Sequence, residues 1–86
     1  SYGIVTIHRP SNTDSLDNLT ELINQIVKTS EIISLAFPVH PRTKKALESG
    51  ELLARLESAP NITLLPPLSY LDFMALLSEA TLAITD

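Results

Sequence analysis

The sequence predicts an α/β protein built on a parallel sheet, and two observations lead to this class. Short apolar segments alternate along the chain with segments whose leucines and isoleucines recur at helical spacing. The apolar segments lack the polar alternation of a half-exposed strand, which is typical of strands buried on both faces. Because parallel strands are joined by right-handed crossovers, we expect a three-layer, Rossmann-like half with strand order 3-2-1-4.

The first half of the chain carries two predicted strands and one long helix. Residues 2–7 (YGIVTI) form the first strand, since they are apolar and β-branched. Apolar side chains then recur at helical spacing from residue 16 to about residue 28, and either Asp14 or Ser15 can cap this helix. Residues 32–37 (IISLAF) form the second strand, which is followed directly by a proline.

The second half continues the same alternation. A short helix is predicted around Ala46 and Leu47, and Gly50 ends it. Residues 52–56 form a further helical turn because their leucines share one face. Residues 62–65 (ITLL) form the third strand, which two prolines end.

The last predicted elements are a helix over residues 70–79 and a fourth strand over residues 82–84. Ser69 and Asp72 match a capping box in which aspartate replaces the usual glutamate. Four apolar side chains of this helix are expected to point inward: Phe73, Met74, Leu76 and Leu77.

Composition limits the classes of protein to which the chain can belong. Its 86 residues fit one domain, and the lack of cysteine excludes disulfides and thiolate metal sites within it. A net charge of −4 argues against nucleic-acid binding, which needs a basic surface. No apolar run is long enough to span a membrane, so we expect neither a nucleic acid nor a membrane as partner. We expect a cytoplasmic protein and, because the sequence stops directly after an apolar run, a piece of a larger one.

His8 and Arg9 directly follow the first predicted strand, beside the point where the strand order reverses. Arginine offers a planar cation to phosphate or carboxylate oxygens, and histidine can donate a hydrogen bond or carry a proton. The start of the following helix adds backbone N–H groups. These features favour an anion site at the sheet edge, and the alternative is a strand end with two solvated side chains.

Other residues at the predicted edge are also candidates for a site, and most of them allow two interpretations. His40 caps the next helix while Arg42 is solvated, or His40 and His8 together bind a metal ion. Tyr70 and Phe73 pack in the core, or one of the two rings contacts a base or sugar. Asp86 follows the fourth strand at the same edge, where it caps whatever comes next.

Three stretches, VTIHRPSN, FPVHPRT and LLPPLSYLDFMALLSEATLAITD, resemble in order and spacing the C-terminal domain of the non-hydrolysing UDP-N-acetylglucosamine 2-epimerases. The resemblance implies that residues 1–86 are part of the C-terminal, UDP-binding domain of an enzyme with two Rossmann-like domains, arranged as in GT-B glycosyltransferases. It also implies a homodimer that interconverts UDP-GlcNAc and UDP-ManNAc without a cofactor. In this reaction the C2 proton is lost, and UDP is eliminated and added back.

The resemblance further implies roles for individual residues. His8 matches a histidine beside the diphosphate and is the expected catalytic residue, because a donor there stabilises the departing UDP. Phe73 matches an aromatic position near the uracil, and Leu68 a loop position whose backbone can meet the base. The family often has Gln at the position of Leu68, and Ser11 also departs from the commoner pattern. Substrate binding is therefore expected at His8, Arg9, Leu68 and Phe73.

The acid and base carboxylates of the family, and its Ser-Gly-Gly phosphate loop, have no counterpart in these 86 residues. The piece alone is therefore expected to be inactive. Two other classes stay open: a hydrolysing epimerase or GT-B glycosyltransferase that uses the same UDP cleft, and a non-catalytic Rossmann-like binding module. The rest of the polypeptide would discriminate between them, since its carboxylates and acceptor pocket set the reaction.

Overall fold

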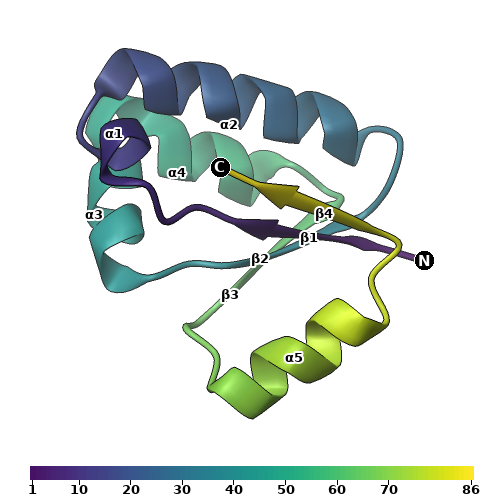
Figure 1. The fold of residues 1–86 in the computed structure, drawn as a ribbon. Coiled ribbons are helices and arrows are strands. Elements are labelled where there is room, and N and C mark those ends of the chain that lie inside the picture. The colour runs from purple at the N-terminus through teal and green to yellow at the C-terminus, as the bar shows by residue number, and fades with distance from the viewer.

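A computed structural model describes residues 1–86 and contains one four-stranded parallel sheet (Figure 1). The strands lie in the order β3-β2-β1-β4, which confirms the predicted topology. The strand order reverses between β1 and β4. These two strands pair side by side although they come from opposite ends of the sequence. The strands are β1 (Gly3–Thr6), β2 (Leu35–Pro38), β3 (Ile62–Leu65) and β4 (Leu82–Thr85).

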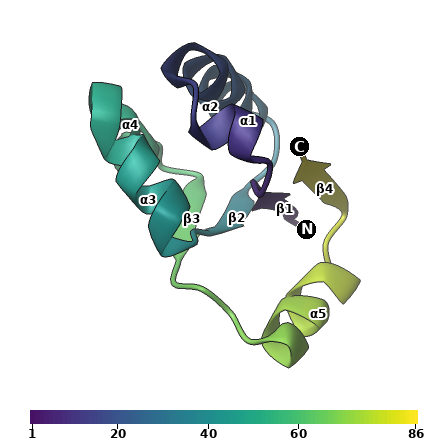
Figure 2. The ribbon, with the colours of Figure 1, turned by 60° about the vertical axis from the view of Figure 1, so that its left-hand side comes forward.

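Helices cover the two faces of this sheet unequally. Figure 2 shows α2, α3 and α4 on one face and α5 alone on the other. This division follows from right-handed crossovers, because the chain moves in one direction from β1 to β3 and returns in the other to β4. The helical elements are α1 (Pro10–Thr13), α2 (Leu16–Ser30), α3 (Pro41–Glu48), the 3₁₀ turn η1 (Ser49–Glu51), α4 (Leu52–Ser58) and α5 (Tyr70–Ser78).

The hydrophobic core lies between the sheet and the layer of α2 to α4. The inward side chains of α2 and α4 meet alternate residues of the three strands β1, β2 and β3 there, as period-2 strands and amphipathic helices require. The core residues are Val5, Ile7, Leu19, Ile23, Ile26, Leu35, Phe37, Val39, Leu47, Leu52, Leu56 and Ile62.

The two glycines stand where a side chain would be costly. Gly3 lies between Leu35 and Leu82 in the sheet, and a Cβ atom there would come within 2.8 Å of the Leu35 side chain. Gly50 has φ 67°, a left-handed conformation that favours glycine, and it separates α3 from α4. The predicted glycine stop after the short helix is therefore confirmed.

The second strand begins later than predicted, at Leu35 and not at Ile32. Helix α2 continues to Ser30, whose hydroxyl donates a hydrogen bond to the carbonyl of Val27. The next residues form a turn in which the backbone N–H of Ile32 bonds to the carbonyl of Thr29, and the Ile32 side chain is 88% exposed. Ile32 lies in the turn between the helix and the strand, so the prediction that the strand includes it is wrong.

Helix α5 is capped as predicted but is less buried than predicted. The Ser69 hydroxyl accepts the backbone N–H of Asp72 at 3.1 Å, and Tyr2 donates a hydrogen bond to the carbonyl of Leu76. None of the four side chains expected to point inward is fully buried: Phe73, Leu76 and Leu77 are half-buried, and Met74 is exposed. The reason is that α5 is the only helix on its face of the sheet, so its flanks have no neighbour.

Helix α1 is an element that periodicity missed. It has four residues, and Pro10 opens it with the backbone angle that the first helical position requires. The cap of α2 is Ser15, one of the two predicted candidates, whose hydroxyl accepts the backbone N–H of Asn18. No helix of the structure is both long and apolar enough to cross a membrane.

Replacing Ile23 with alanine should lower the free energy of unfolding by about 2 to 5 kcal/mol, because the buried side chain leaves a cavity beneath α2. The same change at exposed Ile32 should alter it by less than about 0.5 kcal/mol. Urea unfolding followed by circular dichroism measures both values. Similar losses at the two positions would contradict a turn at residues 32–34 outside the sheet.

Candidate functional site

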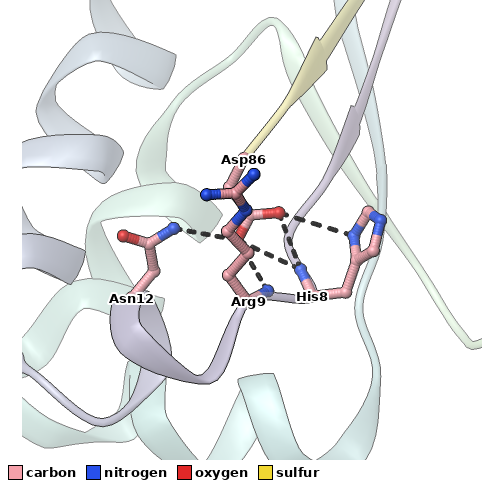
Figure 3. Close-up of polar contacts among 4 residues, drawn as sticks. All are labelled: His8, Arg9, Asn12 and Asp86. Carbon is pink, nitrogen blue, oxygen red and sulfur yellow. Dashed lines mark hydrogen bonds and ion pairs between the residues drawn. The ribbon is translucent and has the colours of Figure 1, made fainter.

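The ends of β1 and β4 are joined by the carboxylate of Asp86 (Figure 3). The sheet register pairs Thr6 with Thr85, so the next residue of β4 lies beside the chain that leaves β1. Asp86 Oδ1 accepts the backbone N–H of His8 at 3.0 Å, and Oδ2 accepts the backbone N–H of Arg9 at 2.9 Å. Oδ2 also accepts the Nδ2 amide of Asn12 at 2.9 Å, so one side chain holds the whole segment that enters α1.

Burial and hydrogen bonding act in opposite directions on Asp86. Its side chain is only 3% exposed, and this burial by itself raises the pKa of the carboxyl. The hydrogen bonds from the His8 backbone, the Asn12 side chain and the Arg9 backbone outweigh burial and lower the pKa of Asp86 to about 2. The carboxylate is therefore ionised at neutral pH even though it is shielded from water.

The side chain of His8 stands at the carboxyl edge of the sheet and is 72% exposed. Its Nδ1 atom lies 3.5 Å from Asp86 Oδ1, which leaves Nε2 on the other side of the ring. Arg9 is also exposed, and its guanidinium forms no salt bridge, whereas its backbone N–H is bound to Asp86. The strand end thus exposes two side chains able to donate to an anion, but Figure 3 shows them on opposite sides of Asp86, and only His8 lines the hollow between the strand ends.

The neighbouring strand end, after β2, supplies a second group of basic residues. His40 is the N-cap of α3 and accepts the backbone N–H of Arg42 through Nδ1 at 3.1 Å, which confirms the helix-cap interpretation. Arg42 is exposed and lies 3.4 Å from Asp14, so it is paired as well as solvated. An open hollow of about 270 Å³ lies between the two strand ends, with His8 on one wall and His40 and Arg42 on the other.

A larger hollow of about 490 Å³ lies beside β3, against α3 and α4. Its walls are mainly leucine, valine and proline, with one lysine and one glutamate. Neither of the two histidines lines this hollow, and none of the residues that the sequence predicts for binding does. The smaller hollow is the candidate site because donors converge on it from two strand ends.

Leu68 and Phe73 lie apart from His8. Both are half-buried, Leu68 in the loop that follows β3 and Phe73 in the first part of α5. Their loop leaves the same carboxyl edge as His8, but β3 is two strands away from β1, about 10 Å at the usual strand spacing. Tyr70 is 76% exposed, so it does not pack in the core. The structure records no contact between His8 and either Leu68 or Phe73.

Two features of this site were missed at the sequence level. Asn12, although part of the stretch that carries the resemblance, was given no role, and Asp86 was expected to cap a following segment, whereas it holds the segment after β1. The predicted strand order carried the necessary signal, because order 3-2-1-4 makes the first residue after β4 a neighbour of the first residues after β1. The hydrogen-bond partners themselves depend on the register, which the sequence pattern leaves free.

Together the fold and the site define a class: a Rossmann-like unit whose basic binding edge lies at the point where the strand order reverses. A family model described as UDP-N-acetylglucosamine 2-epimerase matches residues 1–86. The chain belongs to this family.

Relatives and solved structures agree with this assignment. The chain is 38% identical over 85 residues to a UDP-N-acetylglucosamine 2-epimerase homolog of Methanococcus maripaludis, covering 99% of the chain and 23% of that relative. It is 37% identical to the UDP-N-acetylglucosamine 2-epimerase of Methanocaldococcus jannaschii, again covering 99% of the chain and 24% of the relative. The structure of UDP-GlcNAc 2-epimerase from M. jannaschii superposes on the whole chain with a TM-score of 0.95, at 35% identity and 24% coverage of that protein. The chain therefore spans about a quarter of the length of the proteins it matches.

Acid should remove the contribution of Asp86 to stability, because the folded pKa of about 2 lies below the ordinary value of 3.8. The contribution is complete above about pH 4 and is lost as the pH falls through about 2. At neutral pH we expect Asp86→Asn to cost about 1 to 2 kcal/mol, with solvent screening allowed for. Urea titrations from neutral pH down to pH 2 measure the difference between wild type and variant, which should shrink in acid.

Asp14→Asn is the matched control, since this exposed aspartate forms a surface ion pair with Arg42. It should change the free energy of unfolding by less than about 1 kcal/mol. An Asp86→Asn variant whose stability falls in acid as steeply as that of the wild type would contradict the assignment.

Proposed function

We propose that the chain is part of the UDP-binding domain of an enzyme that interconverts UDP-GlcNAc and UDP-ManNAc. The observation that carries this proposal is the exposed imidazole of His8 at the end of the central strand, beside a fixed carboxylate. Support also comes from relatives named UDP-N-acetylglucosamine 2-epimerase and from a similar M. jannaschii structure in complex with UDP-GlcNAc and UDP. That structure is 36% identical to the chain, with a TM-score of 0.93.

In the proposed reaction a base removes the proton from C2 of the sugar, and the C1–O bond to UDP breaks. The electron pair of the C–H bond forms the C1–C2 double bond of a 2-acetamidoglucal, and the pair of the C1–O bond leaves on the β-phosphate. UDP then adds back to C1, and a proton returns to C2 on the other face. The net change is inversion at C2, so no redox cofactor is consumed.

His8 acts in this proposal on the leaving group. Negative charge develops on the β-phosphate oxygen as the C1–O bond breaks, and a donor already aimed at that oxygen lowers the barrier. Nε2 of His8 is suited to this because it faces away from Asp86 at an exposed edge. Arg9 contributes a permanent positive charge next to it.

Contacts with the nucleoside are proposed at the other end of the edge. The backbone at Leu68 would meet the edge of the uracil, and the ring of Phe73 would lie near its face. The separation of these residues from His8 in the chain, with Leu68 in the loop after β3 and Phe73 on α5, suits a ligand with an apolar base at one end and a diphosphate at the other. The sugar would then face the part of the enzyme that this chain does not contain.

We further propose that residues 1–86 form only one wall of a cleft between two domains. The carboxylates that move the C2 proton would come from the other domain, so the isolated piece is inactive. The complete enzyme is proposed to be a cytoplasmic homodimer. Sedimentation of the purified full-length protein measures its molecular mass and so tests whether it is a dimer. A hydrolysing epimerase or a GT-B glycosyltransferase is the alternative within this fold, and analysis of the released sugar distinguishes them.

His8→Ala should slow epimerisation by about 100- to 1000-fold while affecting UDP affinity far less, because the donor acts mainly as the C1–O bond breaks. The assay uses a full-length enzyme that carries these residues, either encoded with its own flanking sequence or built by replacing the matching quarter of the M. jannaschii relative. Turnover is followed by proton NMR of the two sugars, and UDP binding by calorimetry.

His40→Ala is the matched control for this variant, since it removes the chain's other histidine. The loss of its helix cap should cost about 1 kcal/mol of stability and have a smaller effect on turnover. Unchanged turnover in His8→Ala would remove His8 from the proposed mechanism.

The isolated 86-residue chain should not exchange the C2 proton of UDP-GlcNAc with solvent, because it lacks the proposed base. Incubation in heavy water followed by mass spectrometry detects one incorporated deuterium. The full-length enzyme serves as the positive control and should incorporate it. Deuterium incorporation by the isolated chain would show that a base lies within residues 1–86.

A further inference from the structure

We infer that Asp86 is a positioning residue for His8: it keeps a proton on Nδ1 of the ring and so presents Nε2 to the leaving diphosphate. This inference rests on the proposed function, and it assigns a role to an aspartate that does not itself touch the substrate.

The two oxygens of Asp86 have different tasks. Oδ1 accepts the backbone N–H of His8 at 3.0 Å and also lies 3.5 Å from Nδ1 of the same residue (Figure 3). Oδ2 accepts from Arg9 and Asn12, which hold the loop, and it also lies 3.2 Å from the backbone nitrogen of His8, so only the contact with the ring belongs to Oδ1 alone. Asp86 therefore holds the backbone of His8 by hydrogen bonds, and its Oδ1 atom also lies beside one nitrogen of the exposed ring.

The charge of Asp86 determines where the proton of the ring must be. An ionised carboxylate can only accept hydrogen bonds, so the ring nitrogen that faces it is favoured when it carries hydrogen. The side chain of Asp86 is only 3% exposed, which by itself would disfavour its charge. The carboxylate nevertheless stays ionised at neutral pH because three donors bind it. Nδ1 of His8 is thereby the protonated nitrogen, and Nε2 is the one left for a ligand.

This arrangement has a direct consequence for the leaving group. When the ring carries a second proton, it sits on Nε2 and can donate only towards the open edge of the sheet, where the β-phosphate oxygen receives the electron pair of the C1–O bond. The negative charge of Asp86 balances the positive charge of the ring. When UDP adds back, the same contacts act in reverse, so His8 and Asp86 do not have to reorient between elimination and re-addition.

Nitrogen-15 NMR of the histidine-labelled full-length enzyme tests the inference without substrate. At alkaline pH, where the ring is neutral, the wild type should show the Nδ1–H tautomer at His8, identified by loss of the signal in His8→Gln. Asp86→Asn should change it to Nε2–H, because an asparagine amide can donate to Nδ1. Nε2–H in the wild type overturns the inference, and this measurement decides even if Asp86→Asn fails to fold.

Asn12→Ala is the control for loosening of the loop. It removes a hydrogen bond to Oδ2 of the same carboxylate but leaves Oδ1 beside the ring. The variant should lose stability and keep the Nδ1–H tautomer of His8. A change of tautomer in Asn12→Ala as large as that in Asp86→Asn overturns the inference, because general loosening would then explain both.

Kinetics provide the second measurement. Asp86→Asn should lower kcat by about 10- to 100-fold, with a smaller change in KM, as expected for the loss of a partner that orients a reacting side chain. Asp86→Glu, which restores the charge, should recover part of the lost kcat. Unchanged kcat in Asp86→Asn overturns the inference.

The two measurements separate this inference from the proposed function. An active epimerase with Nε2–H in the wild type overturns the positioning role and leaves the function standing. An inactive full-length protein with the Nδ1–H tautomer overturns the function, and the role of Asp86 in the mechanism with it, while the contact between the two side chains stands.

Discussion

The carboxylate of Asp86 connects the two ends of this chain, and the geometry of the candidate site depends on it. The segment that leaves β1 must turn away from the sheet edge, and this leaves the backbone N–H groups of His8 and Arg9 without partners in the sheet. Asp86 accepts both, together with the amide of Asn12. The segment after β1 is thus tied to the neighbouring strand, and the ring of His8 lies beside the same carboxylate.

The two faces of the sheet differ in a way that bears on the site. The face under α2 to α4 contains the cluster of twelve buried apolar residues, whereas Ile4, which is buried too, lies outside this cluster; the loops after β1 and β2 run into α1 and α3. The opposite face carries α5 alone, whose apolar side chains stay partly exposed. Groups proposed to act on the diphosphate therefore stand on the well-packed side of the molecule. The proposed contacts with the base stand on a helix with few neighbours.

Local sequence patterns were sufficient for most of the fold. The alternation of apolar segments and helical stripes gave the order of strands and helices, and Ser15 and Ser69 marked helix starts correctly because capping is a local interaction. The pattern failed at Ile32, since an exposed apolar residue in a turn has the same local appearance as the first residue of a buried strand. It also failed for the burial of Met74, which depends on whether another helix lies beside α5.

The sequence by itself determined the four strands, the longer helices, their order and the edge at which His8, Arg9, His40 and Asp86 gather, because apolar periodicity and crossover handedness are set by local chemistry. The tertiary structure alone decided which of these residues touch. Asp86 meets His8 across a separation of 78 positions, and this contact requires the register that pairs Thr6 with Thr85. Register results from the packing of whole strands against the helices, so no single stretch of sequence contains it.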